Sequence, residues 1–581
     1  MIISLRYLYR KVTSIKMAKI HPNCIKDLAN RLLLVLFLCN ILFNHAIANE
    51  QNQAAIASAH PLATQAGFEI LNQGGNAFDA AIAVSAALAV VEPFGSGLGG
   101  GGFWLLHRAS DGFQTMIDGR ETAPAAAHQD MYLDNNGELN AHLSLDGSLA
   151  AAIPGVPAAL DHLSQYYGRL SLQQTLAPAI RYAKQGFKVS KTYQKLAGFR
   201  LSALSHSPQT SAIFLRNGEI PELGTLIIQH DLANTLQLLA KFGRSGFYQG
   251  NIAQKLVSGV QQAGGIWTLQ DLKNYRVKER QPITTLYKGY KITSAALPSS
   301  GGIVLTSILN QLEQLPIDKA DNIQHKHLIV EAMRRAYFDR SRYLGDSDFV
   351  TVPTDHLVSK TYAQQLAASI DLHSATTNVD LPAVDIIKGE DTTHFSIIDK
   401  QGNRVAATLS INYPFGSGFI PAGTGVLLND EMDDFSAQTG AANAYGLTGN
   451  HANAITANKR PLSSMTPTFI ENENRLMIIG TPGGSRIITM VLLGILDFID
   501  GNDAKTIVSQ PRFHHQYLPN KIQIESIGFD SKELEQLKHY GHEIKRLNRQ
   551  YGNMQIIIQT KNPNTLTAAS DPRGEGLSLV Q

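Results

Sequence analysis

A threonine stands at the head of a predicted strand pair in the last third of the chain. Directly after Thr392, residues 394–398 form an extended run, and a turn over 399–403 leads into the apolar run 405–411. Two such runs joined by a short loop that contains a glycine predict a β-hairpin. Threonine at a strand start is by itself ordinary β-propensity. The hairpin still constrains the fold, because it brings two strand edges together beside Thr392.

A threonine hydroxyl group is a weak nucleophile at neutral pH unless a base lies beside it. An N-terminal threonine carries its own base, because the reference pKa of an α-amino group is roughly 7.7–8.0. At residue 392 that amine exists only after the bond between Asp391 and Thr392 has been cut. The sequence therefore suggests a precursor that cleaves itself before Thr392.

A strand, a glycine loop and a helix are predicted in succession further along the chain. Residues 476–480 indicate a buried strand, 481–484 spell Thr-Pro-Gly-Gly, and the apolar run from 485 to about 500 is typical of a helix. This order places the backbone N–H groups of Gly483 and Gly484 near a helix N-terminus, where partial positive charge collects. Such donors can form an oxyanion hole, although Pro-Gly-Gly is also an ordinary turn.

The glycine-rich stretch 95–100 contains the spacing G-x-G-x-x-G, which occurs in dinucleotide-binding folds. In those folds the motif follows a strand and opens a helix. Here it follows the alanine-rich helix predicted over Ala77–Val91 and leads into the strand-like residues 103–107. The histidines show no zinc-site spacing with a third ligand, and His514-His515 is expected to be structural. We therefore predict neither a cofactor nor a metal.

The first 48 residues have the features of an export signal. Arg31 precedes the apolar run 32–43, which is followed by the small-residue ending Ala46-Ile47-Ala48. About 12 apolar residues are few for a membrane span, which needs roughly 20. We expect cleavage after Ala48 and an exported protein, periplasmic or extracellular. Retention of residues 1–48 as a membrane anchor is the alternative.

The basic charge of the chain is concentrated in the same segment. Residues 1–48 hold seven Lys or Arg and one acidic residue, a net charge of +6. Because the whole chain carries +2, the remaining residues carry −4. A mildly acidic chain gives no electrostatic reason to expect a nucleic-acid partner. Both cysteines, Cys24 and Cys39, also lie there, so the predicted mature chain can form no disulfide.

Ten short motifs lie along the predicted mature chain. Downstream of residue 391 the set comprises TTHF, SINYPFGSG, NDEMDDFS, NKRPLSSM and TPGGSRIIT. Upstream it comprises HPLATQAGFEILNQGGNAFDAAIA, VEPFGSGLGGGGF, DGRETAP, LPSSGG and DRSRYLGDSDFV. Each motif is moderately specific, but by their number and order nearly the whole predicted mature chain resembles the γ-glutamyltransferase (glutathione hydrolase) family of N-terminal-nucleophile (Ntn) hydrolases.

The resemblance implies a role for each residue around the nucleophile. Thr392 would cut the chain at the Asp391–Thr392 bond and then attack the γ-glutamyl carbonyl of a donor such as glutathione. The Gly483 and Gly484 N–H groups would hold the oxyanion. Ser410 matches a hydroxyl that assists the nucleophile, a position at which many members have threonine.

The resemblance also implies how the head group of the donor is bound. Arg120, Ser463 and Ser464 would bind its α-carboxylate, which agrees with the fit of a guanidinium fork to a carboxylate. The acceptors for its α-ammonium would be Asn412, Glu431 and Asp434. Without the motif, 431–434 would be taken as a solvated acidic loop.

Tyr445, within the polar segment 438–450, matches an aromatic residue on a lid over the bound γ-glutamyl group. An exposed loop tyrosine is the alternative. The acyl group would pass from the enzyme to water, an amino acid or a peptide.

The fold implied by the resemblance is an α+β, four-layer αββα sandwich of the Ntn-hydrolase type. We expect a large subunit of residues 49–391 and a small subunit of residues 392–581 in one compact unit, and a chain of 581 residues with 44% apolar residues can form such a core. One alternative activity is a glutaryl-type β-lactam (cephalosporin) acylase. Another is a catalytically silent protein that binds γ-glutamyl peptides.

Overall fold

The computed structural model describes residues 53–377, 392–437 and 443–581. The predicted signal 1–48, the cleavage-site residue Asp391 and both cysteines lie outside the described residues. Among the described residues, no helix combines the length and apolar character needed to cross a membrane.

Residues from both ends and from the middle of the chain build the first of two large sheets. Its seven strands run in the order β18 (Leu577–Val580), β1 (Ala55–Ser58), β9 (Thr393–Ile398), β10 (Arg404–Ser410), β2 (Gly101–Arg108), β3 (Phe113–Asp118) and β6 (Lys278–Arg280). All the pairings are antiparallel. The hairpin predicted after Thr392 is therefore confirmed, and it forms the centre of this sheet.

The second sheet has six antiparallel strands. Their order is β17 (Asn564–Ser570), β16 (Gln555–Lys561), β12 (Arg475–Gly480), β11 (Thr468–Glu471), β8 (Tyr290–Ser294) and β7 (Ile283–Tyr287). Smaller pairings join β4 (Phe187–Lys188) to β5 (Leu226–Ile227), and β13 (Phe513–His514), β14 (Ile522–Ile524) and β15 (Ile544–Arg546) to one another.

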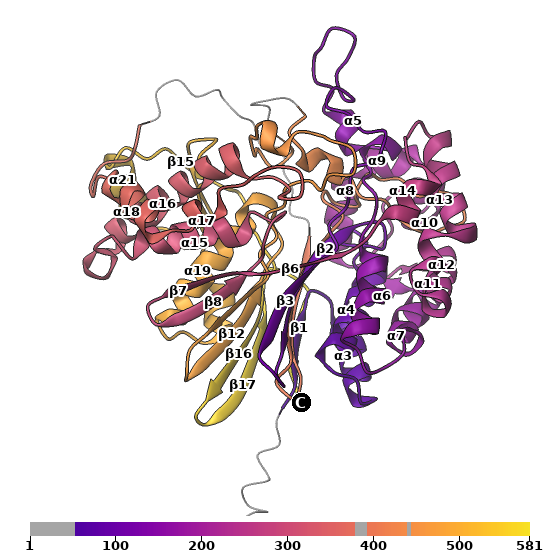
Figure 1. The fold of residues 1–581 in the computed structure, drawn as a ribbon, viewed down its shortest axis with the longest axis horizontal. Helices are drawn as coiled ribbons and strands as arrows, with labels where there is room; N and C mark the ends of the chain where they lie inside the picture. Colours follow the sequence, from indigo (N-terminus) through magenta and orange to yellow (C-terminus); the bar gives the residue numbers. More distant parts are fainter. Residues whose placement is uncertain (1–52, 378–391, 438–442) are drawn as a thin grey trace, which may run out of the picture. The chain divides into compact units, whose positions relative to one another are not determined.

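Helices cover the outer face of each sheet, so the described residues form the predicted αββα sandwich (Figure 1). One layer contains α3 (Pro61–Asn72), α4 (Ala77–Val91), α6 (Val156–Tyr166), α7 (Leu172–Gln185), α8 (Lys191–Phe199), α11 (His230–Phe242) and α13 (Gly250–Gln262). The other contains α15 (Gly301–Leu312), α16 (Asn322–Tyr343), α18 (Lys360–Ala368), α19 (Ile487–Ile499), α20 (Ala504–Ser509) and α21 (Ser531–His539). The short helices are α5 (His142–Leu145), α9 (Leu201–His206), α10 (Pro208–Phe214), α12 (Ser245–Tyr248), α14 (Leu269–Asn274) and α17 (Thr354–Leu357).

Alternating side chains of the first sheet enter two different cores. On β2, Trp104 and Leu106 belong to the core beneath α4, whereas Phe103 and Leu105 belong to the core shared with the second sheet. Successive residues of a strand point to opposite faces. A strand buried on both faces therefore needs an almost continuous apolar sequence, which β2 has.

The glycine run before β2 allows an unusually close approach of the backbone to β10. A Cβ atom on Gly100 would lie 2.1 Å from the carbonyl oxygen of Ser410. The run follows α4 and leads into a strand, as predicted, and it forms a contact between strands. The G-x-G-x-x-G spacing therefore has a packing explanation.

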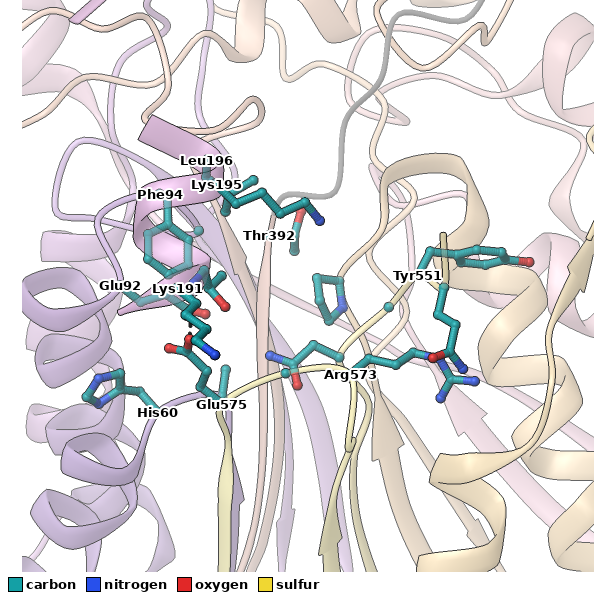
Figure 2. A pocket seen from close by; sticks show the side chains of 18 residues that line it. His60, Glu92, Phe94, Lys191, Lys195, Leu196, Thr392, Tyr551, Arg573 and Glu575 are labelled. Carbon is teal, nitrogen blue, oxygen red and sulfur yellow. Dashed lines mark hydrogen bonds between the residues drawn. The ribbon is translucent and has the colours of Figure 1, made fainter. Parts of the chain in front are cut away.

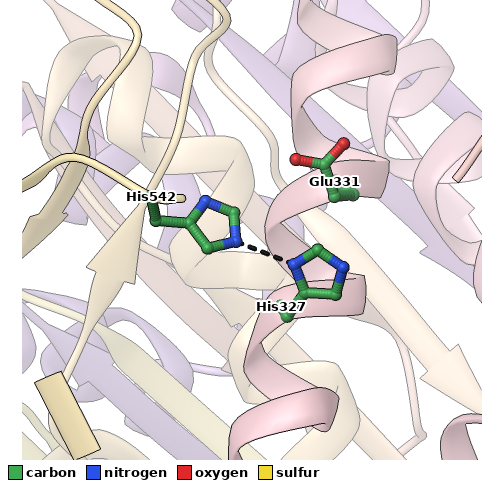
Figure 3. Close-up of side chains that lie close together, drawn as sticks. All are labelled: His327, Glu331 and His542. Atoms are coloured by element: carbon green, nitrogen blue, oxygen red, sulfur yellow. Dashed lines mark hydrogen bonds between the residues drawn. The ribbon is translucent and has the colours of Figure 1, made fainter. Parts of the chain in front are cut away.

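A buried pair of histidines links α16 to the segment after α21. His327 Nδ1 lies 2.8 Å from His542 Nε2, and His327 Nε2 lies 2.8 Å from the carbonyl oxygen of Asp371 (Figure 3). A carbonyl only accepts, so His327 carries its hydrogen on Nε2 and His542 donates to His327 Nδ1. Burial lowers the pKa of His327, and burial together with the nearby His327 lowers that of His542 to about 4.

We predict that Gly100→Ala destabilises the protein by about 1–3 kcal/mol, because the new methyl group would displace the β10 backbone. Gly97→Ala is the matched control within the same run, since its Cβ atom would meet its nearest neighbour at an ordinary 3.6 Å. Denaturant unfolding of the two variants measures the difference. Equal losses of stability would contradict the close contact.

A second prediction concerns acid stability. In the folded protein His542 is neutral, whereas in the unfolded chain it gains a proton below its reference pKa of about 6.5. The stabilisation is therefore complete above about pH 6.5 and is lost as the pH falls towards 4. His542→Gln keeps an N–H donor but does not titrate, so its melting temperature should fall less than that of the wild type between pH 7.5 and 5.

His542→Ala is the companion variant. It leaves His327 Nδ1 buried without a donor, which should cost about 1–3 kcal/mol already at pH 7.5. Identical pH dependence of the wild type and His542→Gln would show that this pair does not titrate in the way inferred.

Candidate active site

Thr392 lies immediately before β9 and opposite the end of β10. Its Oγ is 3.2 Å from the Oγ of Ser410, and both side chains are buried. The register of the hairpin explains the approach, because Leu409 pairs with Thr393, and Ser410 and Thr392 are the next residues along the two chain segments. Ser410 Oγ accepts a hydrogen bond from the N–H of Asn412 at 2.8 Å. Its own hydrogen remains available to Thr392 Oγ, and either hydroxyl group of this pair can donate.

Two cavities meet at Thr392. The smaller, of about 20 Å³, has room for about one water molecule and is referred to below as the head-group pocket. The larger, of about 240 Å³, lies on the other side of Thr392 and is referred to as the outer cavity (Figure 2). The head-group pocket is lined by Arg120, Thr392, Ser410, Asn412, Glu431, Asp434, Tyr445, Leu447, Ser463, Ser464, Met465, Gly484, Ser485 and Ile487. The structure therefore brings ten of the eleven predicted catalytic and head-group-binding residues together, and Gly483 adjoins them in sequence.

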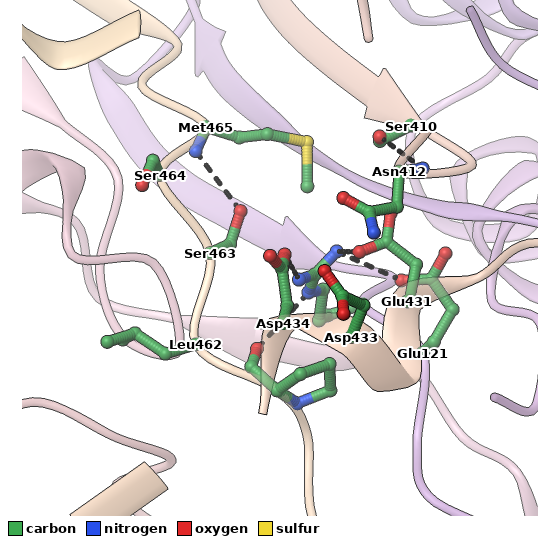
Figure 4. A network of polar contacts seen from close by, with 12 residues as sticks. Glu121, Ser410, Asn412, Glu431, Asp433, Asp434, Leu462, Ser463, Ser464 and Met465 are labelled. Atoms are coloured by element: carbon green, nitrogen blue, oxygen red, sulfur yellow. Dashed lines mark hydrogen bonds and ion pairs between the residues drawn. The ribbon is translucent and has the colours of Figure 1, made fainter. Parts of the chain in front are cut away.

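A buried ion cluster forms the floor of the head-group pocket (Figure 4). Arg120 donates through Nη1 to Glu431 Oε2 and through Nη2 to Asp434 Oδ2, the latter at 2.6 Å. The guanidinium is only 1% exposed, as is Glu431. Burial raises the pKa of Glu431, and the positive charge of Arg120 opposes this rise. The alternative of a solvated acidic loop, considered without the family motif, does not hold, since 431–434 forms a short 3₁₀ turn with Glu431 and Asp433 buried.

Two hydroxyl groups at the pocket wall are set to donate. Ser463 Oγ accepts from the N–H of Met465 at 3.1 Å, and Ser464 Oγ accepts from Arg340 Nη2 at 3.2 Å. A hydroxyl that accepts in this way keeps its own hydrogen for another partner. Both serines can therefore donate to an anionic group in the pocket, and Arg120 supplies the positive charge.

Acceptors face the same space. Glu431 Oε1 is buried and has no hydrogen-bond partner among the described residues. Asn412 donates through Nδ2 to the carbonyl oxygen of Asp430 at 3.0 Å, and this bond leaves its Oδ1 as an acceptor. Donors for a carboxylate and acceptors for an ammonium group therefore line one small pocket.

The glycine loop has the predicted position after β12. The helix begins slightly later than expected, because Gly484–Arg486 forms a 3₁₀ turn and α19 starts at Ile487. Gly483 and Gly484 have φ values of 137° and 56°. Within the described part of the chain, neither N–H group donates a hydrogen bond that would occupy it. Two unused donors next to a nucleophile have the character of an oxyanion hole.

Tyr445 lines the head-group pocket and is buried, so the alternative of an exposed loop tyrosine does not hold. It is buried, and its hydroxyl donates to the carbonyl oxygen of Asn412 at 2.8 Å. A Cβ atom on Gly484 would lie 2.3 Å from the Tyr445 ring, so glycine is required beneath it. Gln516 holds the same loop from the other side by donating to the carbonyl oxygens of Tyr445 and Gly446 at 3.2 and 3.1 Å.

Two of these supporting residues escaped the sequence analysis. Arg340 lies within the motif DRSRYLGDSDFV, so that motif was a signal, although nothing in it indicated Ser464 as a partner. Gln516 follows His514-His515 and gave no recognisable signal. His514 is buried and forms hydrogen bonds with the side chains of Thr489 and Gln516, which agrees with its expected structural role.

The described residues contain one group that offers three metal-ligand atoms close together, namely His327, Glu331 and His542, within 4.8 Å of one another. Both oxygens of Glu331 already accept hydrogen bonds, from Arg334 and from Arg335 together with Thr376. Two guanidinium charges beside the carboxylate oppose a bound cation. The group fits a hydrogen-bonded link better than a metal site.

Comparison with known proteins agrees with this geometry. The family model described as gamma-glutamyltranspeptidase matches residues 63–580. A glutathione hydrolase proenzyme from Pseudomonas sp. (strain A14) is 41% identical over 522 residues, which cover 88% of this chain and 91% of that protein. The protein of the same name from Escherichia coli (strain K12) is 41% identical over 531 residues, 90% of each chain.

Solved structures show the same fold. Cephalosporin acylase from Bacillus halodurans superposes with a TM-score of 0.81 at 27% identity, covering 91% of this chain and 96% of that one. The γ-glutamyltranspeptidase of Helicobacter pylori superposes with a TM-score of 0.54 at 39% identity, covering 55% of this chain and 92% of that one. The predicted Ntn-hydrolase fold and N-terminal-nucleophile enzyme class are confirmed. The chain belongs to the γ-glutamyltranspeptidase family.

Proposed function

We propose that this protein is a γ-glutamyltransferase and glutathione hydrolase that uses Thr392 as its nucleophile. The observation that carries the proposal is the head-group pocket, in which buried groups of opposite charge lie within reach of a threonine at a strand start. Amino-acid head groups carry one carboxylate and one ammonium group. A pocket with separate partners for each selects a γ-glutamyl donor over a donor that lacks either charge.

The head-group pocket, at about 20 Å³, has to widen to admit the donor, and binding exchanges one set of ion pairs for another. The α-carboxylate takes the place of Glu431 and Asp434 at Arg120 and receives hydrogen bonds from Ser463 and Ser464. The α-ammonium then pairs with the two released carboxylates. The pocket gains one positive and one negative group together, so no buried charge is left unpaired, which would cost several kcal/mol.

The reaction follows from the position of the two cavities. Thr392 Oγ attacks the γ-carbonyl carbon of the donor, and the hydroxyl proton passes to the α-amino group of Thr392 itself. The N–H groups of Gly483 and Gly484 stabilise the oxyanion. The amide C–N bond breaks, the leaving nitrogen takes the proton, and a γ-glutamyl ester of Thr392 remains. Water or an amine then attacks this ester and returns the proton to Oγ.

We propose that the same hydroxyl cuts the precursor at the Asp391–Thr392 bond. Thr392 has a φ of 110°, a region that β-branched residues avoid and that costs of order 1–3 kcal/mol. Cleavage removes this torsion altogether, because no carbonyl carbon then precedes the nitrogen. Strain in the precursor thus favours scission, giving subunits of residues 49–391 and 392–581. Export with removal of residues 1–48 belongs to the same proposal and rests on the signal-like sequence.

We predict that Thr392→Ala stays a single polypeptide, whereas the wild type and Thr392→Ser separate into two on a denaturing gel. N-terminal sequencing of the smaller wild-type product should begin at Thr392, and the mass of the larger should fit a start after Ala48. Processing of Thr392→Ala would refute the mechanism. A wild-type protein that stays intact would favour the silent binding protein.

A second candidate function is suggested by the similarity to cephalosporin acylase. A glutaryl donor has no α-amino group, so Glu431 and Asp434 would lack a cation to bind. The unpartnered Oε1 of Glu431 favours the γ-glutamyl donor.

The ratio of kcat/KM for γ-glutamyl and glutaryl p-nitroanilide distinguishes the two. We predict a wild-type ratio of about 100, because a desolvated charge pair is worth about 2–5 kcal/mol. Glu431→Gln and Asp434→Asn should each lower this ratio at least about tenfold, a change of about 1.4 kcal/mol. General damage to the site would lower kcat/KM for both donors alike, so the ratio itself controls for such damage. A wild-type ratio below 1 would favour the acylase.

A further inference from the structure

The carboxyl group of Asp430 is completely buried and takes no part in the chemistry proposed above. It stands immediately before the 3₁₀ turn 431–434, where an aspartate ordinarily accepts hydrogen bonds from the first N–H groups of the turn. Here Asn429 Oδ1 accepts from the N–H of Glu431 at 3.0 Å, and the Asp430 side chain does not cap the turn. Asp430 Oδ1 instead reaches the segment after β10, where it accepts from the N–H of Tyr413 at 2.9 Å.

The segment that Asp430 reaches is an irregular strand end. β10 ends at Ser410, and Asn412 has a φ of 70°, in the left-handed region that asparagine tolerates better than most residues. Backbone groups of Asp430 hold the same segment. Its N–H donates to the carbonyl oxygen of Ile411 at 3.2 Å, and its carbonyl oxygen accepts from Asn412 Nδ2 at 3.0 Å. Asp430 therefore forms a hydrogen bond with each of the three residues 411–413.

Asn412 connects this strand end to the reacting groups. Its N–H donates to Ser410 Oγ at 2.8 Å, and Ser410 Oγ lies 3.2 Å from Thr392 Oγ (Figure 4). Its carbonyl oxygen accepts from the hydroxyl group of Tyr445 at 2.8 Å. Its Oδ1 is the acceptor assigned above to the ammonium group of the donor. A displacement of Asn412 would therefore disturb the head-group pocket and the nucleophile together.

The surroundings of Asp430 favour the neutral form of its carboxyl group. Burial raises the pKa of Asp430 well above its ordinary value, against the opposing effects of the Arg200 charge and the Tyr413 N–H. The carboxylates of Asp433 and Glu431 add to the rise. The neutral group accepts through Oδ1 and carries its proton on Oδ2, which has no hydrogen-bond partner in the described part of the chain. An asparagine has the same shape and the same acceptor, so Asp430→Asn preserves the contact with Tyr413.

We propose that Asp430 is a positioning residue, which holds Asn412 in place at the boundary between the head-group pocket and the nucleophile. Asp430 does not line the head-group pocket, so it acts on a donor only through the strand end 411–413. This inference rests on the proposed binding of a γ-glutamyl donor. It gives Asp430 a share in selecting the donor, because a displaced Asn412 weakens the binding of the ammonium group, which a glutaryl donor lacks.

The experiment compares Asp430→Ala with Asp430→Asn in processed enzyme, with γ-glutamyl and glutaryl p-nitroanilide as donors. Asp430→Ala leaves the Tyr413 N–H without an acceptor and should lower kcat/KM for the γ-glutamyl donor at least about tenfold, since a small misplacement within a site is costly to the rate. The ratio of kcat/KM for the two donors should fall at least about threefold, because only the γ-glutamyl donor has an ammonium group to lose. Asp430→Asn should keep both values within about twofold of the wild type, because it keeps the acceptor.

A double-mutant cycle with Asn412→Ala separates positioning from general damage. If Asp430 acts on the donor through Asn412, Asp430→Ala should lower the donor ratio in the wild-type background and leave it unchanged in the Asn412→Ala background. Should the alanine variant not fold, Asp430→Ser replaces it in both backgrounds, because its shorter side chain also gives up the hydrogen bond from Tyr413.

Asp399→Ala is the matched control. Asp399 is a buried carboxylate that accepts from the N–H groups of Ala77 and Gln401 at the far end of the same hairpin. Its replacement should lower the melting temperature and leave the donor ratio unchanged. The proposal would be overturned by an unchanged ratio in Asp430→Ala, by an equal fall of the ratio in both backgrounds, or by an equal loss in Asp430→Asn. A wild type that hydrolyses no γ-glutamyl anilide would instead refute the proposed function.

Discussion

The guanidinium group of Arg120 is the charge around which the site is built. It comes from the segment after β3, and the carboxylates that neutralise it, Glu431 and Asp434, come from a 3₁₀ turn more than 300 residues later. A buried charge without a partner costs several kcal/mol. The pairing therefore fixes how the parts before and after Thr392 pack together. The same pairing keeps the charged groups of the head-group pocket beside groups of opposite charge before a donor arrives.

This arrangement is the physical reason for proposing a zwitterion as the ligand of the pocket. A lone carboxylate at Arg120 would release Glu431 and Asp434 as unpaired buried anions, and a lone ammonium would compete with Arg120 for them. Only a ligand with both charges replaces each ion pair with another. Ser463 and Ser464 add selectivity without adding charge, because they accept hydrogen bonds from Met465 and Arg340 and keep their own hydroxyl hydrogens for another partner.

Local sequence patterns predicted helices and strands well where a single local pattern defines the element. The helix over Ala77–Val91 has the predicted bounds, because Asn76 caps it and Glu92-Pro93 ends it, and the hairpin after Thr392 follows from two apolar runs around a glycine turn. The roles of Arg120, Asn412 and the serines came from family motifs, since their convergence spans several hundred residues. Arg340 and Gln516 were missed for the same reason. Their roles depend on contacts with residues that are distant in the sequence, and no local spacing of residues encodes such contacts.

The placement of Thr392 between two cavities follows from the sheet. β9 lies in the middle of the first sheet and is flanked by β1 and β10, so a residue just before its first position is held by neighbours on both sides. Such a residue can project its side chain into one space while its backbone borders another. The group recognised in the head-group pocket and the group exchanged on the far side are thereby separated by the nucleophile itself. An enzyme with this geometry can be strict about the acyl group and tolerant of the amine, because different side chains contact each.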